Sequence, residues 1–136
     1  MAPKTSKNSY TYAVGRRKSA VASVKLTKGK GDSVVNQIPL NKYFPTKLDQ
    51  ISYEKPFVIT KTLDKYHFQS KIIGGGKTGQ VQALALAISR ALIKIDINFK
   101  PELRAAGLLT VDSRVKERRM VGTGGKSRRQ KQSPKR

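Results

Sequence analysis

The sequence predicts an α+β domain followed by a long basic C-terminal tail. Two segments, residues 19–26 and 66–73, alternate apolar and polar side chains, as strands with one buried face do. Between residues 81 and 95, apolar side chains recur at helical spacing. Both patterns stop after Val111, and residues 121–136 contain Val121 as their one large apolar residue. Such a segment buries too little surface to offset roughly 1–2 kcal/mol of backbone entropy per residue.

The first predicted strand spans residues 19–26 and has one buried face. The face that we expect to be buried carries Ala20, Ala22, Val24 and Leu26. A turn is predicted at residues 29–32, where two glycines flank a lysine. Residues 33–36 are then predicted to return as the second strand of a hairpin.

Prolines set the expected bounds of the two helices that follow. Pro39 begins a short helical turn that runs to Tyr43. Thr46 is a favoured N-cap residue, so a second helix is expected over residues 47–54. Pro56 is expected to end this helix, because an internal proline removes a hydrogen bond and clashes with the preceding turn.

The second half of the chain contains the strongest helical pattern. Three glycines at 74–76 separate the predicted strand at residues 66–73 from the helix over residues 81–95. This helix is expected to pack on the sheet through Val81, Leu84, Ala85, Ile88, Ala91, Leu92 and Ile95. A short helix over residues 99–106 follows, with Gly107 as its stop. Residues 108–110 can add a last short strand.

Charge is concentrated at both ends of the chain. Its 136 residues include 29 Lys and Arg against 8 Asp and Glu, which gives a formal charge of +21. Residues 1–30 and 111–136 each carry a net charge of +8. Cationic flanks repel themselves when free, and phosphates that neutralise them release condensed counterions. We therefore predict nucleic acid as the partner and three parts: a basic N-terminal extension (1–9), a globular RNA-binding domain (10–110) and an extended basic tail (111–136).

Few residues fit an active site or a metal site. The chain has no cysteine and His67 is its one histidine, which argues against a metal site. The loop at residues 74–78 lacks the first glycine of a Walker A motif, because position 71 is lysine. The carboxylates show no pairing typical of acid–base catalysis. We therefore predict a protein that is not an enzyme, with no metal, no cofactor and no small-molecule substrate.

The candidate RNA-binding residues form three groups. The first consists of Arg16, Arg17 and Lys18, just after Tyr10 and Tyr12, whose rings can stack on bases or sugars. Arginine can bind a phosphate through two donors of its planar fork, although a solvated basic strand end is the alternative interpretation. The second is Lys77 after the glycine run, where helix-start N–H groups can approach a phosphate or the loop can be a flexible connection. The third, in the tail, is Arg114, Lys116, Arg118, Arg119, Lys126, Arg128, Arg129, Lys131, Lys135 and Arg136.

Three stretches also carry a resemblance to a known family. They are residues 14–22 (VGRRKSAVA), the glycine loop of residues 74–80 and residues 105–118 (AAGLLTVDSRVKER). In this order and spacing they resemble the small-subunit ribosomal protein family number nine, from Tyr10 to Arg136. The resemblance implies a four-stranded mixed sheet backed by helices, similar to the second domain of ribosomal protein five, with a long basic C-terminal tail.

The same resemblance implies a structural constituent of the small ribosomal subunit. The protein would bind rRNA in the head of the subunit, next to other head proteins, in the cytoplasm or in a plastid or mitochondrial ribosome. The family's tail reaches the peptidyl-site tRNA, and Lys135 and Arg136 occupy the matching end here. Pro134 and Gln132 depart from the family pattern, and Gln132 stands where many members have an aromatic residue. No aromatic stacking contact is therefore carried over to that position.

Two other classes of protein also have a strongly basic chain. A free nonspecific nucleic-acid-binding protein or RNA chaperone is the alternative, because basic arms by themselves do not distinguish RNA from DNA. A membrane-surface domain is less favoured, since the amphipathic helix carries few cations, Arg90 and Lys94, on its polar face. No apolar run approaches the roughly 20 residues that span a bilayer. We therefore expect no membrane partner.

Overall fold

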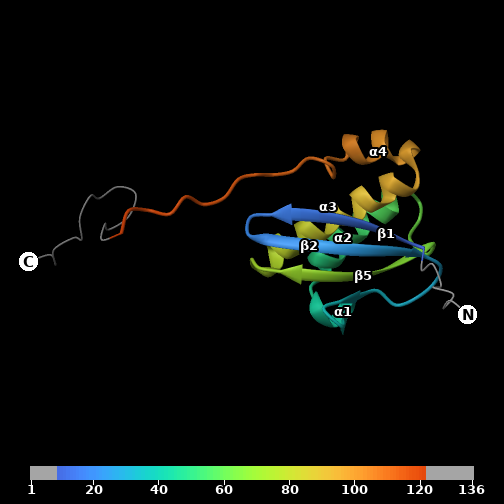
Figure 1. Cartoon of the computed structure of the whole chain (residues 1–136), viewed down its shortest axis with the longest axis horizontal. Coiled ribbons are helices and arrows are strands. Elements are labelled where there is room, and N and C mark those ends of the chain that lie inside the picture. The colour runs from blue at the N-terminus through green and yellow to red at the C-terminus, as the bar shows by residue number, and fades with distance from the viewer. Residues whose placement is uncertain (1–8, 122–136) are drawn as a thin grey trace, which may run out of the picture.

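The computed structural model describes residues 9–121, which form one sheet with helices on one of its faces (Figure 1). The elements in chain order are β1 (Tyr10–Arg17), β2 (Ala20–Lys28), β3 (Val34–Val35), β4 (Ile38–Pro39), α1 (Leu40–Tyr43), α2 (Lys47–Ile59), β5 (Tyr66–Ile73), α3 (Lys77–Ile95), a 3₁₀ turn (Ile97–Phe99) and α4 (Lys100–Ala105). Helices α2 and α3 lie behind the sheet in Figure 1. The predicted α+β class with a mixed, helix-backed sheet is confirmed.

The sheet has five strands in the order β1-β2-β5-β3-β4, one more than expected. β1 pairs antiparallel with β2, and β2 pairs antiparallel with β5 along eight residue pairs. β3 pairs in parallel with β5 through Val34 opposite Gln69 and Val35 opposite Ser70. β1 is therefore an edge strand, and β5 holds the centre of the sheet.

Two strands were not predicted from the sequence, the two-residue β4 and the much longer β1. β1 is the one that matters for the site. Its covered face carries Thr11, Ala13, Gly15 and Arg17, which include just one aliphatic side chain, so the alternating pattern is weak. α3 lies very close to this face: a Cβ on Gly15 would collide with the carbonyl oxygen of Ala83 and lie 2.6 Å from the amide nitrogen of Ala87. Small residues thus let a helix pack directly on the strand.

Two strand predictions need correction: residues 34–35 form the strand β3 but with another partner than predicted, and the prediction for residues 108–110 is wrong. Residues 33–36 do not return along β2, because β5 occupies that edge of β2 from Val21 opposite Ile73 to Lys28 opposite Tyr66. Residues 108–110 form no strand, and the Leu108 N–H instead donates to the Leu103 carbonyl at 3.1 Å, which closes the C-terminal end of α4. Gly107 has the positive φ of +73° expected at that helix stop.

The helix predictions were largely right, apart from the role of Pro56. α2 continues through this proline to Ile59, with Pro56 and Phe57 both buried. The Pro56 carbonyl accepts from the N–H of Thr60 at 3.2 Å and from its hydroxyl at 2.9 Å, so the helix closes just beyond the proline. Burial of the apolar ring and of Phe57 offsets the hydrogen bond that proline cannot make.

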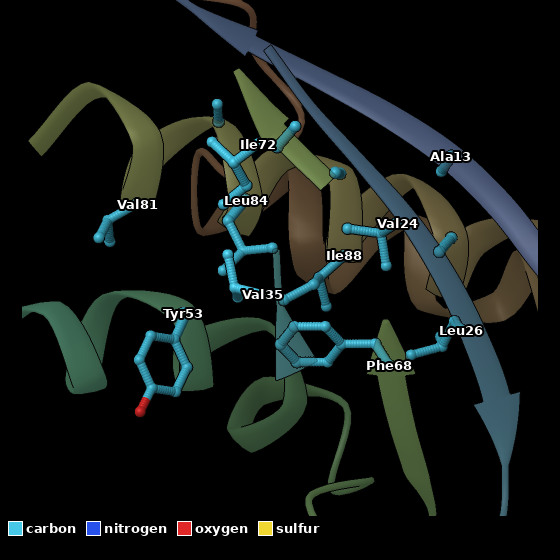
Figure 2. Close-up of a cluster of buried hydrophobic side chains, with 14 of the residues drawn as sticks. Ala13, Val24, Leu26, Val35, Tyr53, Phe68, Ile72, Val81, Leu84 and Ile88 are labelled. Carbon is cyan, nitrogen blue, oxygen red and sulfur yellow. The ribbon is translucent and has the colours of Figure 1, made fainter. Parts of the chain in front are cut away.

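The core lies between the covered face of the sheet and the helices (Figure 2). The predicted buried faces are confirmed apart from Ile95, which is 38% exposed near the end of α3. Alternate residues of β2 and β5 point inward, and α3 contributes the largest number of buried side chains. Phe68 of β5 stacks on Phe57 of α2 with ring centroids 6.3 Å apart. Leu103 fastens the short helix α4 to this core and is fully buried. The chain continues from α4 toward the basic tail. The burial of Leu103 therefore fixes where the tail leaves the domain.

Candidate nucleic-acid interface

Two of the predicted basic groups meet at one end of the sheet, where β1 turns into β2 and β5 leads into α3. The glycine loop lies directly on this turn: a Cβ on Gly74 would be 2.6 Å from the carbonyl oxygen of Ser19. A Cβ on Gly75 would be 2.9 Å from the Cβ of Ala20, and both glycines have positive φ. The glycine run therefore permits close packing of the loop on the basic turn.

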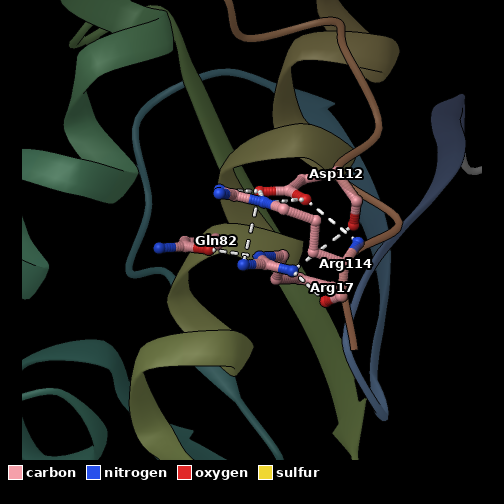
Figure 3. Close-up of polar contacts among 4 residues, drawn as sticks. All are labelled: Arg17, Gln82, Asp112 and Arg114. Atoms are coloured by element: carbon pink, nitrogen blue, oxygen red, sulfur yellow. Dashed lines mark hydrogen bonds and ion pairs between the residues drawn. The ribbon is translucent and has the colours of Figure 1, made fainter. Parts of the chain in front are cut away.

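The start of the basic tail comes to the same end, held by Arg17 (Figure 3). Arg17 Nη1 donates to the Arg114 carbonyl at 2.8 Å, and Arg17 Nη2 lies 3.3 Å from Asp112 Oδ2. Arg17 Nε donates to Gln82 Oε1 of α3 at 2.8 Å. The Arg17 side chain is only 12% exposed, and its guanidinium binds groups of this chain rather than solvent. Arg17 therefore acts as an anchor for the start of the tail.

Asp112 joins two arginines in this cluster. Arg114 Nη2 donates to Asp112 Oδ2 at 2.7 Å, and Arg114 Nε and its backbone N–H both donate to Asp112 Oδ1. The side-chain hydrogen bond from Arg114, more than the charge of Arg17, holds the pKa of Asp112 well below its usual range. The same contacts raise the pKa of Arg114. Asp112 is thus an anion already neutralised within the chain.

We define the basic end as residues 16–19, the loop and helix start of residues 74–79, and residues 112–119. Around the Arg17 anchor, the other cations are exposed to solvent: Arg16, Lys18, Lys77, Arg114, Lys116, Arg118 and Arg119. Residues 111–121 form neither helix nor strand and run away from the sheet (Figure 1, orange to red). The candidates Lys126, Arg128, Arg129, Lys131, Lys135 and Arg136 lie outside the described residues.

Lys77 occupies a more constrained position than the glycine run suggested. Its Nζ donates to the Tyr43 carbonyl at 3.2 Å and lies 3.4 Å from the centroid of the Tyr43 ring. Lys77 therefore ties the start of α3 to α1 while remaining exposed. Gly76 is the N-cap of α3, and no side chain among residues 9–121 caps this helix start.

Two cations of α3 bind to the edge of β1, and the sequence pattern did not predict this role. Arg90 Nη1 donates to the Val14 carbonyl and Lys94 Nζ to the Tyr12 carbonyl, both at 2.7 Å. The two residues are four positions apart on α3, which is also typical of a helix face exposed to solvent. Their role could not be predicted because the edge strand β1 was itself not predicted. By using carbonyls of that edge, the two cations reduce its capacity to pair with another strand.

Within residues 9–121, no cluster of three or more His, Cys, Asp or Glu residues could hold a metal ion. The ring nitrogen Nδ1 of His67 is hydrogen-bonded with the Gly29 carbonyl at 3.1 Å. No helix in this part of the chain has the length and apolar character to cross a membrane.

Comparisons with known proteins place the chain in a family. The family model described as ribosomal protein S9/S16 matches residues 15–136. The chain is 47% identical over 116 residues to the small ribosomal subunit protein uS9 of Maridesulfovibrio salexigens, covering 85% of this chain and 89% of the relative. It is 48% identical over 115 residues to the uS9 of Ureaplasma parvum, covering 85% and 86% of the two chains. The uS9 of Ureaplasma urealyticum is 47% identical over 115 residues, with the same coverage.

Proposed function

Because the chain belongs to the ribosomal protein S9/S16 family, we propose that it is a structural constituent of the small ribosomal subunit that binds rRNA through its basic end. Members of this family are structural proteins, which supports the prediction that the chain is not an enzyme. The protein would be located where its ribosome is. That is the cytoplasm if the ribosome is bacterial, like those of the relatives, or an organelle.

The observation that carries the proposal is the meeting of basic segments far apart in the sequence. Arg17 holds together the turn at Lys18, the start of α3 and the start of the tail. It donates hydrogen bonds to Gln82, Asp112 and Arg114, which are 65, 95 and 97 positions further along the chain. Asp112, the acidic group at the centre of the cluster, is paired with two arginines. The surrounding exposed cations therefore outnumber Glu117, the one exposed acidic residue of the basic end, and present a net positive charge to a polyanion.

The mechanism would be electrostatic. Each Lys or Arg that meets a phosphate releases condensed counterions, so binding depends on salt. If the basic end and the tail together neutralise about ten phosphates of irregular RNA, log affinity should fall with log salt with a slope of roughly −7. The sites would be Arg16, Lys18, Lys77, Arg114, Lys116, Arg118 and Arg119, continued by Lys126, Arg128, Arg129 and Lys131. Arg17 would position the tail start.

The test replaces three exposed cations of the basic end, Lys18→Gln, Arg118→Gln and Arg119→Gln together. The control removes the same charge at the opposite end of the sheet, with Lys28→Gln, Lys30→Gln and Lys61→Gln. Binding to an rRNA fragment from the head is measured at several salt concentrations. We expect the first variant to reduce the steepness of the salt dependence by about 2, at about 0.7 per lost phosphate contact, and the control by less. An equal effect of both triple variants would show that net charge alone governs binding.

We propose in addition that the end of the tail approaches tRNA in the peptidyl site of the head. Lys135 and Arg136 end the basic tail at the position where the family resemblance implies this contact. Deletion of residues 133–136 should preserve folding and subunit incorporation but weaken retention of peptidyl-site tRNA, as measured by filter binding. Full tRNA retention after the deletion would contradict this role.

The alternative of a free nonspecific nucleic-acid-binding protein is tested by sedimentation. Co-sedimentation with small subunits after a moderate salt wash is expected for a ribosomal constituent. Recovery mainly with chromosomal DNA would instead favour the alternative.

A further inference from the structure

The face of the sheet opposite the helices is uncovered along β1, β2 and β5 (Figure 1). Two tyrosines of β1 lie on this open face, Tyr10 and Tyr12, and each is 47% exposed. Val21 and Ile73 are also exposed, and they pair with each other across β2 and β5. The open face thus presents aromatic and aliphatic surface that the core does not use.

Charge on this open face has a single sign. Arg16, Lys25 and Lys71 are exposed there, one on each of the three long strands. None of the chain's 8 acidic residues lies in β1, β2 or β5. An aromatic surface with cations and no acid is complementary to phosphate and bases rather than to an average protein surface.

The strand register places each tyrosine beside a cation. Tyr12 lies opposite Lys25, which in turn lies opposite Gln69 of β5. Lys25 Nζ lies 5.1 Å from the centroid of the Tyr10 ring. A depression of about 690 Å³ adjoins these residues, lined on the open face by Ser23, Lys25, Gln69 and Lys71. Stacking surface, positive charge and polar groups for base edges therefore lie within a few strand spacings of one another.

We propose that this open sheet face binds unpaired nucleotides of RNA, with bases stacked on Tyr10 and Tyr12 and phosphates at Lys25 and Lys71. Unpaired bases expose their faces to aromatic side chains, whereas bases inside a duplex are stacked on one another. A broad sheet face also cannot enter the narrow major groove of an RNA helix. The proposal rests on the proposed function for the presence of RNA, but it assigns a second surface and a different mode of contact.

The test uses the full chain and two probes, a decauridine strand and a blunt-ended RNA duplex. Tyr10→Leu with Tyr12→Leu removes the rings and keeps apolar side chains, while Tyr10→Phe with Tyr12→Phe retains stacking. We expect the leucine variant to bind decauridine at least about fivefold more weakly and the phenylalanine variant to bind it as the parent does. Duplex affinity should be unchanged in both variants, and circular dichroism verifies that they are folded. Ultraviolet cross-linking should join decauridine to the peptide that contains Tyr10 and Tyr12.

The two proposals fail in different ways. The variant at Lys18, Arg118 and Arg119 tests the basic end through the duplex probe, and it leaves the open face intact. Loss of duplex affinity in that variant, with full decauridine binding in the leucine variant, would overturn the stacking face and retain the proposed function. The opposite result is loss of decauridine binding in the leucine variant with full duplex affinity in the variant at Lys18, Arg118 and Arg119. That result would support the stacking face and count against the basic end. Cross-links from Tyr12 to a protein rather than to RNA in assembled subunits would also overturn the stacking face.

Discussion

Arg17 and Asp112 are 95 residues apart in the sequence, yet their side chains form an ion pair with Nη2 and Oδ2 separated by 3.3 Å. Arg17 ends β1, and Asp112 lies just beyond the last helix. The pair therefore fixes the direction in which the basic segment leaves the domain, next to the turn that carries Lys18.

Replacement of Asp112 by asparagine should free the start of the tail without unfolding the domain. The Asp112 side chain is 33% exposed and that of its second partner, Arg114, is 85% exposed, and ion pairs in such positions add little to global stability. We expect several-fold faster trypsin cleavage after Arg114 and an unchanged melting temperature. Glu117→Gln removes the same charge from an exposed position further along the chain and serves as the control. Equal cleavage rates in the parent and both variants would show that Asp112 does not hold the segment.

The contact between Arg17 and Asp112 should persist into mildly acid solution. The pKa of Asp112 lies well below its usual value of about 3.9, chiefly because Arg114 donates to its carboxylate. A lowered pKa in the docked state makes a stabilising contribution that is present above the ordinary pKa and lost as the pH falls through the lowered value. The NMR signals of the Arg17 Nη2 protons, which face Asp112 Oδ2, should therefore stay constant from pH 7 to about 4.5. A shift of those signals with a midpoint near 5 or above, absent from Asp112→Asn, would contradict the assignment.

Gly15→Ala should destabilise the fold strongly. The added methyl group would collide with the Ala83 carbonyl and the Ala87 amide, which belong to the backbone of α3 and cannot rotate away. We expect a loss of about 3 kcal/mol in the free energy of unfolding, measured by urea denaturation. Gly76→Ala, where a Cβ meets nothing within 4 Å, should cost less than about 1 kcal/mol. Comparable losses at the two positions would argue against close packing of β1 on α3.

Leu103→Ala should show how much α4 depends on the core. Leu103 is fully buried, so truncation leaves a cavity and should reduce the free energy of unfolding by about 2–4 kcal/mol. Leu48→Ala is the matched control, since Leu48 is 73% exposed and its truncation should change the stability by less than about 0.5 kcal/mol. Faster trypsin cleavage after Arg104 in Leu103→Ala would show that α4 is loosened. Equal stability of the two variants would mean that Leu103 does not fasten α4.

Much of the fold follows from local pattern. The alternation in β2 and β5 and the helical spacing of α3 each match the observed elements, because each has a large apolar face with one period. β1 lacks that signal, since its covered face is made of small and polar residues that only the nearby helix explains. The predicted pairing of residues 33–36 with the first predicted strand is wrong for a related reason. Which strand occupies an edge of the sheet depends on partners that are distant in the sequence.

The candidate site divides in the same way. Runs of Lys and Arg identify cationic segments, and Arg16 and Lys18 are exposed as such segments require. Their sequence does not distinguish Arg17 from these neighbours, although Arg17 is the residue whose guanidinium is bound to Gln82 and to the tail start. The difference arises because alternate residues of a strand face opposite sides of the sheet.

The amino-acid sequence by itself determined that this protein has a small helix-backed sheet, an excess of cations at both ends and the motifs of its family. The tertiary structure decided which cations act together and which serve as anchors, and it revealed the uncovered face with Tyr10 and Tyr12. Composition and periodicity are local properties of the chain, whereas the pairing of Arg17 with Asp112 depends on the packing of β1, α3 and α4 around one core.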